Sequence, residues 1–238
     1  MNEHIGSVEP RRLYQQIADQ VRLLIRDGHF PAGSRLPAER ELAQQLGVSR
    51  PSLREALIAL EIAGNVEIRM GSGIYVTVEP ENRPGVQGGS VGESVLEIMQ
   101  ARALVEGSAI VMACSQMTSE TLERLRANLD AMHALIATGR KAIDLDRQFH
   151  LIIAEQSGNS VMARIVRDLF DERYSPLTAQ IRTRFETGDT WMLALAEHEK
   201  IYAALEARDS LLAQAAMRMH LEASKQRWME SEPMRAQV

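Results

Sequence analysis

The sequence predicts a mainly α-helical protein, with an N-terminal winged helix-turn-helix domain and a C-terminal all-α antiparallel helical bundle. Three observations predict this class. Apolar residues recur at helical spacing through most of the 238 residues. The spacing changes to alternation at 65–78, around "GSG", which indicates a β-hairpin. The Pro/Gly-rich stretch that begins at residue 79, "EPENRPGVQGGSVGE", has the composition of a linker. We therefore expect domains at 1–78 and 92–230, joined by a linker at 79–91.

Length and composition agree with two globular domains in a reducing compartment. A chain of 238 residues exceeds the roughly 100–150 of a typical domain. Its 45% hydrophobic and 25% charged residues are ordinary for a soluble protein. The single cysteine, Cys114, excludes an intrachain disulfide. No secretory signal opens the sequence, and no run of about 18 apolar residues occurs. We expect a cytoplasmic protein without a membrane span.

The net charge of −5 argues against nucleic acid as a partner, but its distribution changes that conclusion. Residues 1–78 hold nine arginines and nine acidic residues, so this part is neutral. The rest of the chain carries all of the excess acid. A neutral first domain can still present a local basic patch to DNA.

The elements of the first domain follow from local signals. Apolar residues at helical spacing predict a helix over 12–27, and "GHFPAGSRLP" is a loop. A second helix, "AERELAQQL", ends at Gly47. Ser49 caps a third helix, with Pro51 in its first turn, and this helix ends at Gly64. The hairpin then completes a winged helix-turn-helix.

The second domain shows only helical patterns. Ser119, Asp189 and Asp209 are candidate N-caps that support the division into helices. The expected segments are 92–116, 118–138, 141–157, 159–174, a short one near 175–186, 189–207 and 209–229.

The third helix has the residues expected of a DNA-reading helix. In a helix-turn-helix the second helix of the pair enters the major groove, and its N-terminal residues meet base edges. Arg50 and Arg54 have the fork that matches guanine, while Ser49 and Ser52 suit phosphate oxygens. The alternative is that these arginines form the solvated face of an ordinary helix. The order of helices and hairpin favours DNA contact.

Residues 11–78, including "GSRLPAERELAQQLGVSRPSLREALIALEIAGNVEIRMGSGIYV", resemble the DNA-binding domain of the GntR family of bacterial transcription regulators. This resemblance implies double-stranded DNA as a partner. It assigns operator contacts to Arg40, Ser49, Arg50, Ser52, Arg54, Gly71 and Ser72, with Arg35 and Arg69 as phosphate partners. One reading helix covers too few base pairs for specificity, so we expect a homodimer on a palindromic operator.

Helical spacing in the second domain aims an acid and three histidines into its core. In "DLDRQFH", Asp146 lies four residues before His150, on the same apolar face. His198 and His220 also lie on apolar faces. A lone buried histidine is usually a hydrogen-bonded core residue, but an unpaired buried acid is costly, and one divalent ion satisfies all four groups. Zn²⁺ is the leading candidate, with Ni²⁺, Mn²⁺ and Fe²⁺ as alternatives. His133 is a weaker candidate because no carboxylate lies four residues away on its face.

Arg102 is a charged residue on a largely apolar helix, "LEIMQARALVEGSAI". Glu106 lies four residues on, so a simple salt bridge is one interpretation. The other is a guanidinium that faces a cavity and clamps a carboxylate with two hydrogen bonds.

Residues 92–229 resemble the FCD ligand-binding domain of the FadR subfamily, on the evidence of "QARALVE", "DRQFH" followed by "SGNS", "HEKIYAALEARD" and "MHLEASK". The resemblance implies a complete metal-ligand pattern at Asp146, His150, His198 and His220. It also implies a small organic acid that binds at the metal and changes operator affinity. Asn159, in the family's "GN", would either bind this effector or only cap a helix.

The motifs "EPRRLYQQIA", "GSGIYV" and "HLEASK" are most similar to repressors of hexuronate utilisation. This similarity implies a hexuronate, or its keto form, as the effector. Other branches of the family respond to lactate, pyruvate, gluconate or sialic acid. Two further functions stay open at this stage: a metal-dependent enzyme that uses the Asp/His site, and a regulator that senses the metal itself. Arg102 favours an organic acid over bare metal, because bare metal needs no carboxylate clamp. Against an enzyme, no further carboxylate or histidine is placed as a general base, and an enzyme has no use for a regulatory helix-turn-helix.

Overall fold

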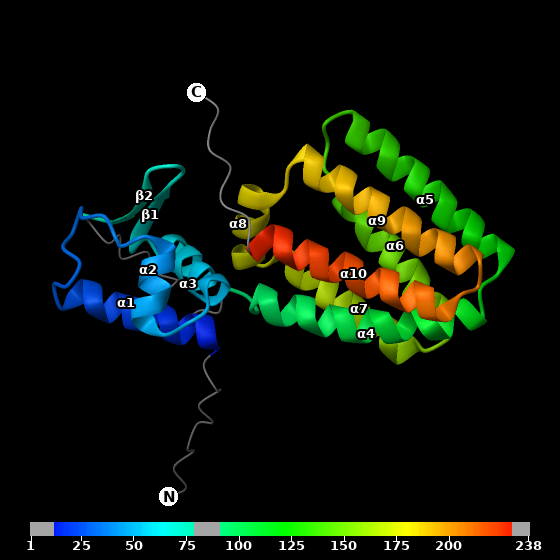
Figure 1. Cartoon of the computed structure of the whole chain (residues 1–238), viewed down its shortest axis with the longest axis horizontal. Coiled ribbons are helices and arrows are strands. Elements are labelled where there is room, and N and C mark those ends of the chain that lie inside the picture. Colours follow the sequence, from blue (N-terminus) through cyan, green and yellow to red (C-terminus); the bar gives the residue numbers. More distant parts are fainter. Residues whose placement is uncertain (1–11, 79–90, 230–238) are drawn as a thin grey trace, which may run out of the picture. The chain divides into compact units, whose positions relative to one another are not determined.

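The computed structural model describes residues 12–78 and 91–229, and it forms two compact units that are considered separately (Figure 1). The first unit reaches Ser94, and the second begins at Val95. All of the expected linker except residue 91 lies outside the described residues, as do the ends of the chain. Among the described residues, no helix combines the length and apolar character needed to cross a bilayer.

The first unit is the expected winged helix-turn-helix. Its elements are α1 (Leu13–Arg26), α2 (Glu39–Leu46), α3 (Arg50–Ile62), β1 (Val66–Arg69) and β2 (Gly73–Val76). The strands pair antiparallel, with Val66 opposite Val76. Gly47 ends α2 in the left-handed region at φ 67°, and Ser49 caps α3 by accepting a hydrogen bond from the Ser52 amide. Helix α1 packs on α3, and their facing side chains form a core that includes Tyr14, Ile17, Val21, Leu53 and Leu57.

The last residues before the second unit pack on the first. The Ser94 hydroxyl donates to a carboxylate oxygen of Glu55 on α3 at 2.8 Å, and Ser94 is buried. The Tyr14 hydroxyl donates to the Gly92 carbonyl at 2.8 Å. Because burial leaves the Glu55 carboxylate little access to water, the Ser94 hydroxyl stabilises it. Helix α4 therefore starts one residue after a residue that is hydrogen-bonded to α3.

The second unit is an all-helical bundle, as expected (Figure 1). Helix α4 packs along α10, α5 packs on α6 and α9, and α6 also packs on α4 and α7. The caps of α5 and α9 are Thr118 and Thr187, rather than Ser119 and Asp189, while Asp209 accepts from the Leu212 amide at the start of α10. The helices are α4 (Val95–Ser115), α5 (Ser119–Ala137), α6 (Ile143–Gln156), α7 (Ser160–Asp171), the 3₁₀ turn η1 (Glu172–Tyr174), α8 (Pro176–Phe185), α9 (Gly188–Glu206) and α10 (Ser210–Met229).

Candidate functional site

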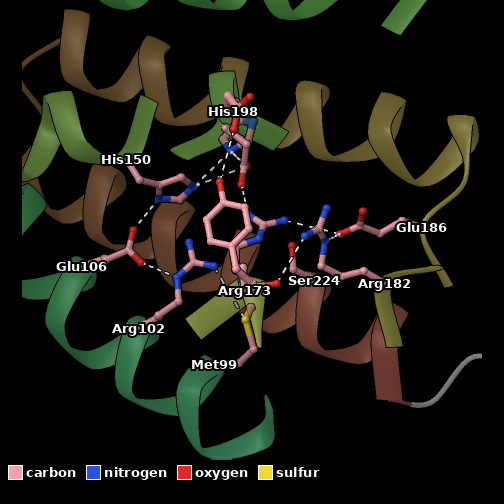
Figure 2. Close-up of polar contacts among 12 residues, drawn as sticks. Met99, Arg102, Glu106, His150, Arg173, Arg182, Glu186, His198 and Ser224 are labelled. Atoms are coloured by element: carbon pink, nitrogen blue, oxygen red, sulfur yellow. Dashed lines mark hydrogen bonds and ion pairs between the residues drawn. The ribbon is translucent and has the colours of Figure 1, made fainter. Parts of the chain in front are cut away.

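Three helices of the second unit bring the four predicted metal ligands together. Helix α6 presents Asp146 and His150 one turn apart, α9 presents His198, and α10 presents His220. All four side chains are buried, and one ligand atom from each lies within 4.8 Å of the others. The Nε2 atoms of His150 and His198 are 3.2 Å apart, and His198 Nε2 lies 3.3 Å from Asp146 Oδ1 (Figure 2). This is a convergent set of nitrogen and oxygen donors.

Two carboxylates contact the Nδ1 atoms of two of the histidines, His150 and His220. Glu106 on α4 pairs with Nδ1 of His150, and His220 Nδ1 lies 2.8 Å from Glu197 Oε2. A histidine that donates Nδ1–H to a carboxylate presents its Nε2 lone pair on the opposite side, as metal-ligating histidines do. From the sequence, Glu106 is expected only as a partner of Arg102, and Glu197 is not expected at the site. Its position one residue before His198 gives no spacing signal toward His220.

The protonation states fit a metal ligand set. Burial is the main cause that lowers the pKa of His198 well below its usual value, and burial also lowers that of His220, so both imidazoles are neutral near pH 7. Burial alone would raise the pKa of Asp146, but Arg173 and the histidines hold it well below its usual range. An ionised carboxylate beside neutral imidazoles is the donor set that a divalent transition metal prefers. The residues present therefore fit the metal that the sequence implies.

Arg102 forms the salt bridge expected from its spacing to Glu106, and it also faces a cavity. Its Nε donates to Glu106 Oε1 at 2.7 Å, which is the i,i+4 ion pair. The guanidinium also lies 3.8 Å from the centre of the Phe170 ring and lines a cavity beside the metal cluster. Its Nη2 is buried and has no hydrogen-bond partner among the described residues. A buried donor without a partner is costly, so this nitrogen is available to a ligand.

The cavity extends from the metal cluster toward η1, α8 and α9. The space between its lining side chains is about 400 Å³, and part of that space is open to solvent. Arg173 of η1 pairs with Asp146 and donates to Glu186, which follows α8 (Figure 2). Trp191 and Trp228 supply aromatic walls. Arg173 and Glu186 were not identified from the sequence, because η1 and the end of α8 lack the periodicity that marks a core face. Trp191 and Trp228 were not identified either, and they lie near the ends of α9 and α10.

Asn159 caps α7, which is one of the two roles considered for it. Its side-chain oxygen accepts hydrogen bonds from the amides of Val161 and Met162 at the start of α7. It is not among the residues that line the cavity. Of the two roles considered for Asn159, the structure therefore supports the purely structural one, because the capping geometry occupies its acceptor oxygen.

Most of the predicted DNA contacts lie on the surface of the first unit. Arg35, Arg40, Ser49, Arg50, Arg69, Gly71 and Ser72 are exposed. Arg69 stacks over Tyr75 at 4.4 Å, and the Ser72 hydroxyl is 2.9 Å from that of Tyr75. A Cβ on Gly73, where φ is +126°, would come within 2.5 Å of Arg35 Nε, so glycine lets Arg35 lie against the wing.

Arg54 and Ser52 differ from the expectation that they contact the operator. The Arg54 side chain is 3% exposed, and its Nε and Nη2 donate to Glu39 of α2 at 3.2 and 2.8 Å. Ser52 is buried, and its hydroxyl lies 2.8 Å from that of Ser49. Residues four apart share a helix face, and Arg54 lies on the face of α3 that meets α2. Arg54 therefore joins the two helices, which leaves Arg50 as the exposed arginine of α3.

Comparison with known proteins identifies the family. Residues 13–76 match the family of bacterial regulatory proteins of the gntR type, and residues 97–223 match the FCD domain. The chain is 35% identical to the Uxu operon transcriptional regulator of Escherichia coli K12, over 94% of this chain and 90% of that protein. It is 34% identical to the Exu regulon transcriptional regulator of the same strain, over 91% of this chain and 84% of that protein.

A solved structure of McbR/YncC from E. coli has the same fold, with a TM-score of 0.53 at 20% identity, and covers 93% of this chain and 99% of that one. The fold, the two domain matches and the full-length relatives agree on one class of protein. The chain belongs to the GntR family of transcription regulators with an FCD domain, which are not enzymes.

We predict that Arg50→Ala weakens operator binding by about 1–3 kcal/mol and relaxes base preference at one position of each half-site. Arg54→Ala should mainly lower the free energy of unfolding, because it leaves Glu39 without its buried partner. DNA selected from a random pool by the wild-type protein serves as the operator, and anisotropy titrations with base-substituted duplexes give the preference. Unchanged specificity in the Arg50 variant would exclude α3 as the reading helix.

We also predict that Asp146→Asn and His220→Ala abolish stoichiometric binding of a divalent metal, since each removes one of four convergent donors. His133→Ala is the matched control, because His133 is exposed on α5 and outside the cluster. Metal content after dialysis against Zn²⁺ and gel filtration is the measurement. Equal metal content in all three variants would place the metal elsewhere.

Proposed function

We propose that the protein is a DNA-binding regulator, in its leading interpretation a repressor, whose operator affinity is changed by a small organic acid bound beside a divalent metal. The observation that carries this proposal is the buried Asp/His cluster next to a cavity into which Arg102 presents an unpartnered donor. Asp146, His150, His198 and His220 would hold the metal. Zn²⁺ is the leading candidate, and when bound it supplies a positive charge that attracts the carboxylate of the acid.

Charge balance supports an anionic effector. The ion pairs at the cavity match arginines with carboxylates: Arg102 with Glu106, Arg173 with Asp146, Arg182 with Glu186 and Arg227 with Glu197. These four pairs sum to zero, His198 and His220 are neutral, and Lys141, which is 3.8 Å from Glu186 Oε2, adds a positive charge. A divalent ion in their midst adds two positive charges to a buried region, and buried charge is stable only when it is compensated. A carboxylate compensates part of it, and the free Nη2 of Arg102 fixes its orientation.

The effector we propose is a hexuronate or its keto form. This proposal rests on the similarity of "EPRRLYQQIA", "GSGIYV" and "HLEASK" to hexuronate-utilisation repressors, and on full-length relatives that regulate the Uxu operon and the Exu regulon. A regulator that senses the metal itself is the rival, since four buried donors suit that role as well. The acid-responsive regulator requires Arg102 to bind the carboxylate of the effector, whereas the metal sensor does not.

We propose that the protein works as a homodimer on a palindromic operator. Helices α4, α7 and α10 expose apolar side chains that a partner subunit would cover, among them Leu104, Val161, Leu211 and Met219. Two-fold proteins match two-fold DNA sites. Light scattering coupled to gel filtration should give twice the chain mass at micromolar concentration. A monomer that binds DNA one-to-one would contradict this proposal.

We predict that His198→Ala and Arg102→Ala proteins still bind the operator but lose the response to the acid. An effector shifts an equilibrium only by its differential affinity for two states, and coupling energies of about 1–3 kcal/mol are usual. Operator titrations with and without hexuronate, at fixed Zn²⁺, measure this coupling. His133→Ala should respond as wild type does.

Two results would overturn the proposal. A normal response in both variants and after removal of the metal would exclude the site. A response to Zn²⁺ alone, with no further effect of any acid, would favour the metal sensor.

A further inference from the structure

Part of the cavity wall is formed by η1, by Glu186 after α8, and by α9. This part carries polar atoms that are neither metal-ligand atoms nor part of Arg102. Glu186 Oε2, Trp191 Nε1 and Arg173 Nε are buried and lack hydrogen-bond partners among the described residues. Lys141 Nζ forms an ion pair with Glu186 Oε2 at 3.8 Å, which is beyond hydrogen-bond range. All three side chains line the cavity that the metal cluster borders. Because unpaired buried polar atoms are rare and costly, these atoms indicate a ligand.

The unpartnered atoms also define the chemistry of that ligand. A carboxylate oxygen accepts hydrogen bonds only, so Glu186 Oε2 requires an O–H or N–H donor. Trp191 Nε1 donates only, so it requires an oxygen acceptor. A carboxylate meets the second requirement and not the first. A hydroxyl group meets both, since it donates one hydrogen and accepts through its lone pairs.

Glu186 lines the cavity and is held through only one of its two carboxylate oxygens. Its Oε1 accepts from Arg182 Nε at 3.1 Å and from Arg173 Nη2 at 3.4 Å. These two arginines fix the carboxylate through one oxygen and leave the other for the cavity. Its side chain is 4% exposed, so solvent gives Oε2 little compensation.

The two ends of the cavity are separated by Arg173. Figure 2 shows Glu186 and Arg182 on one side of Arg173, and His150 and Glu106 on the other. Arg173 contacts both Asp146 and Glu186, so these two carboxylates lie at opposite ends of its guanidinium. The hydroxyl of a two- or three-carbon hydroxy acid is next to its carboxylate, whereas a longer acid also carries hydroxyl groups farther from its carboxylate.

We infer that Glu186 and Trp191 form a hydroxyl-binding subsite for the part of the effector that lies away from its carboxylate. This inference rests on the proposed function, because it places the carboxylate at the metal and Arg102. Glu186 Oε2 accepts from a hydroxyl of the ligand, and Trp191 Nε1 donates to a hydroxyl oxygen. Short acids such as lactate leave both groups unpaired and bind more weakly for that reason.

Isothermal titration of the full-length, Zn²⁺-loaded protein tests the inference, with D-glucuronate, D-galacturonate and L-lactate as the probes. Trp191→Phe removes the indole N–H but keeps an aromatic ring, and Glu186→Gln removes one acceptor oxygen. We expect wild type to bind at least one hexuronate about 10-fold more tightly than lactate. Each variant should weaken hexuronate binding about 10-fold and change lactate binding by less than about twofold.

The outcomes distinguish a failure of the proposed function from a failure of the hydroxyl-binding subsite. If no acid binds the wild-type protein, the proposed function fails and this inference fails with it. If lactate binds as tightly as the hexuronates, or if Trp191→Phe weakens both classes equally or neither, the subsite is excluded while the acid-responsive site stands. Thermal unfolding checks each variant. Should Glu186→Gln not fold, because Arg173 and Arg182 lose their shared partner, Trp191→Phe decides alone.

Discussion

The structure of the second unit depends on one ionised carboxylate buried in a helical bundle. Asp146 is 5% exposed, so its charge must be compensated by neighbouring groups rather than by water. Arg173 provides the direct ion pair, and His150 and His198 place ring nitrogens within 3.8 and 3.3 Å of its Oδ1. Glu106 and Glu197 then orient the histidines, and Arg102 and Arg227 pair with those carboxylates. Each buried charged group in this network is compensated by a neighbouring polar or charged group, which explains why so many polar residues share one core.

The same network reaches the helix nearest in sequence to the DNA-binding unit. Helix α4 carries both Arg102 and Glu106, and it begins at Val95, directly after Ser94. Ser94 is bonded to Glu55 on α3, whose neighbour Arg54 ties α3 to α2. A ligand that draws Arg102 toward a carboxylate acts on α4 at its second turn.

The sequence predicts the elements, and it predicts that Asp146, His150, His198 and His220 converge, for identifiable reasons. Helical spacing places Asp146 and His150 on one face whatever the tertiary structure, and "GSG" between alternating residues defines the wing. The environment of Arg54 is not predictable in this way, because its partner Glu39 is 15 residues away on another helix. Glu186 and Trp191 were missed for a similar reason: they flank the junction of α8 and α9, and only the packed bundle brings them to the metal cavity.

The central claim is that metal and acid bind jointly in one cavity, and thermodynamic linkage tests it most directly. Calorimetric titration measures the affinity of metal-free and Zn²⁺-loaded protein for a hexuronate, and then the affinity for Zn²⁺ with and without saturating hexuronate. Joint binding requires that each ligand strengthen the other by the same factor, since coupling free energies are reciprocal. We expect a factor of about 10 or more in both directions. Hexuronate affinity that is equal with and without Zn²⁺ would contradict the account.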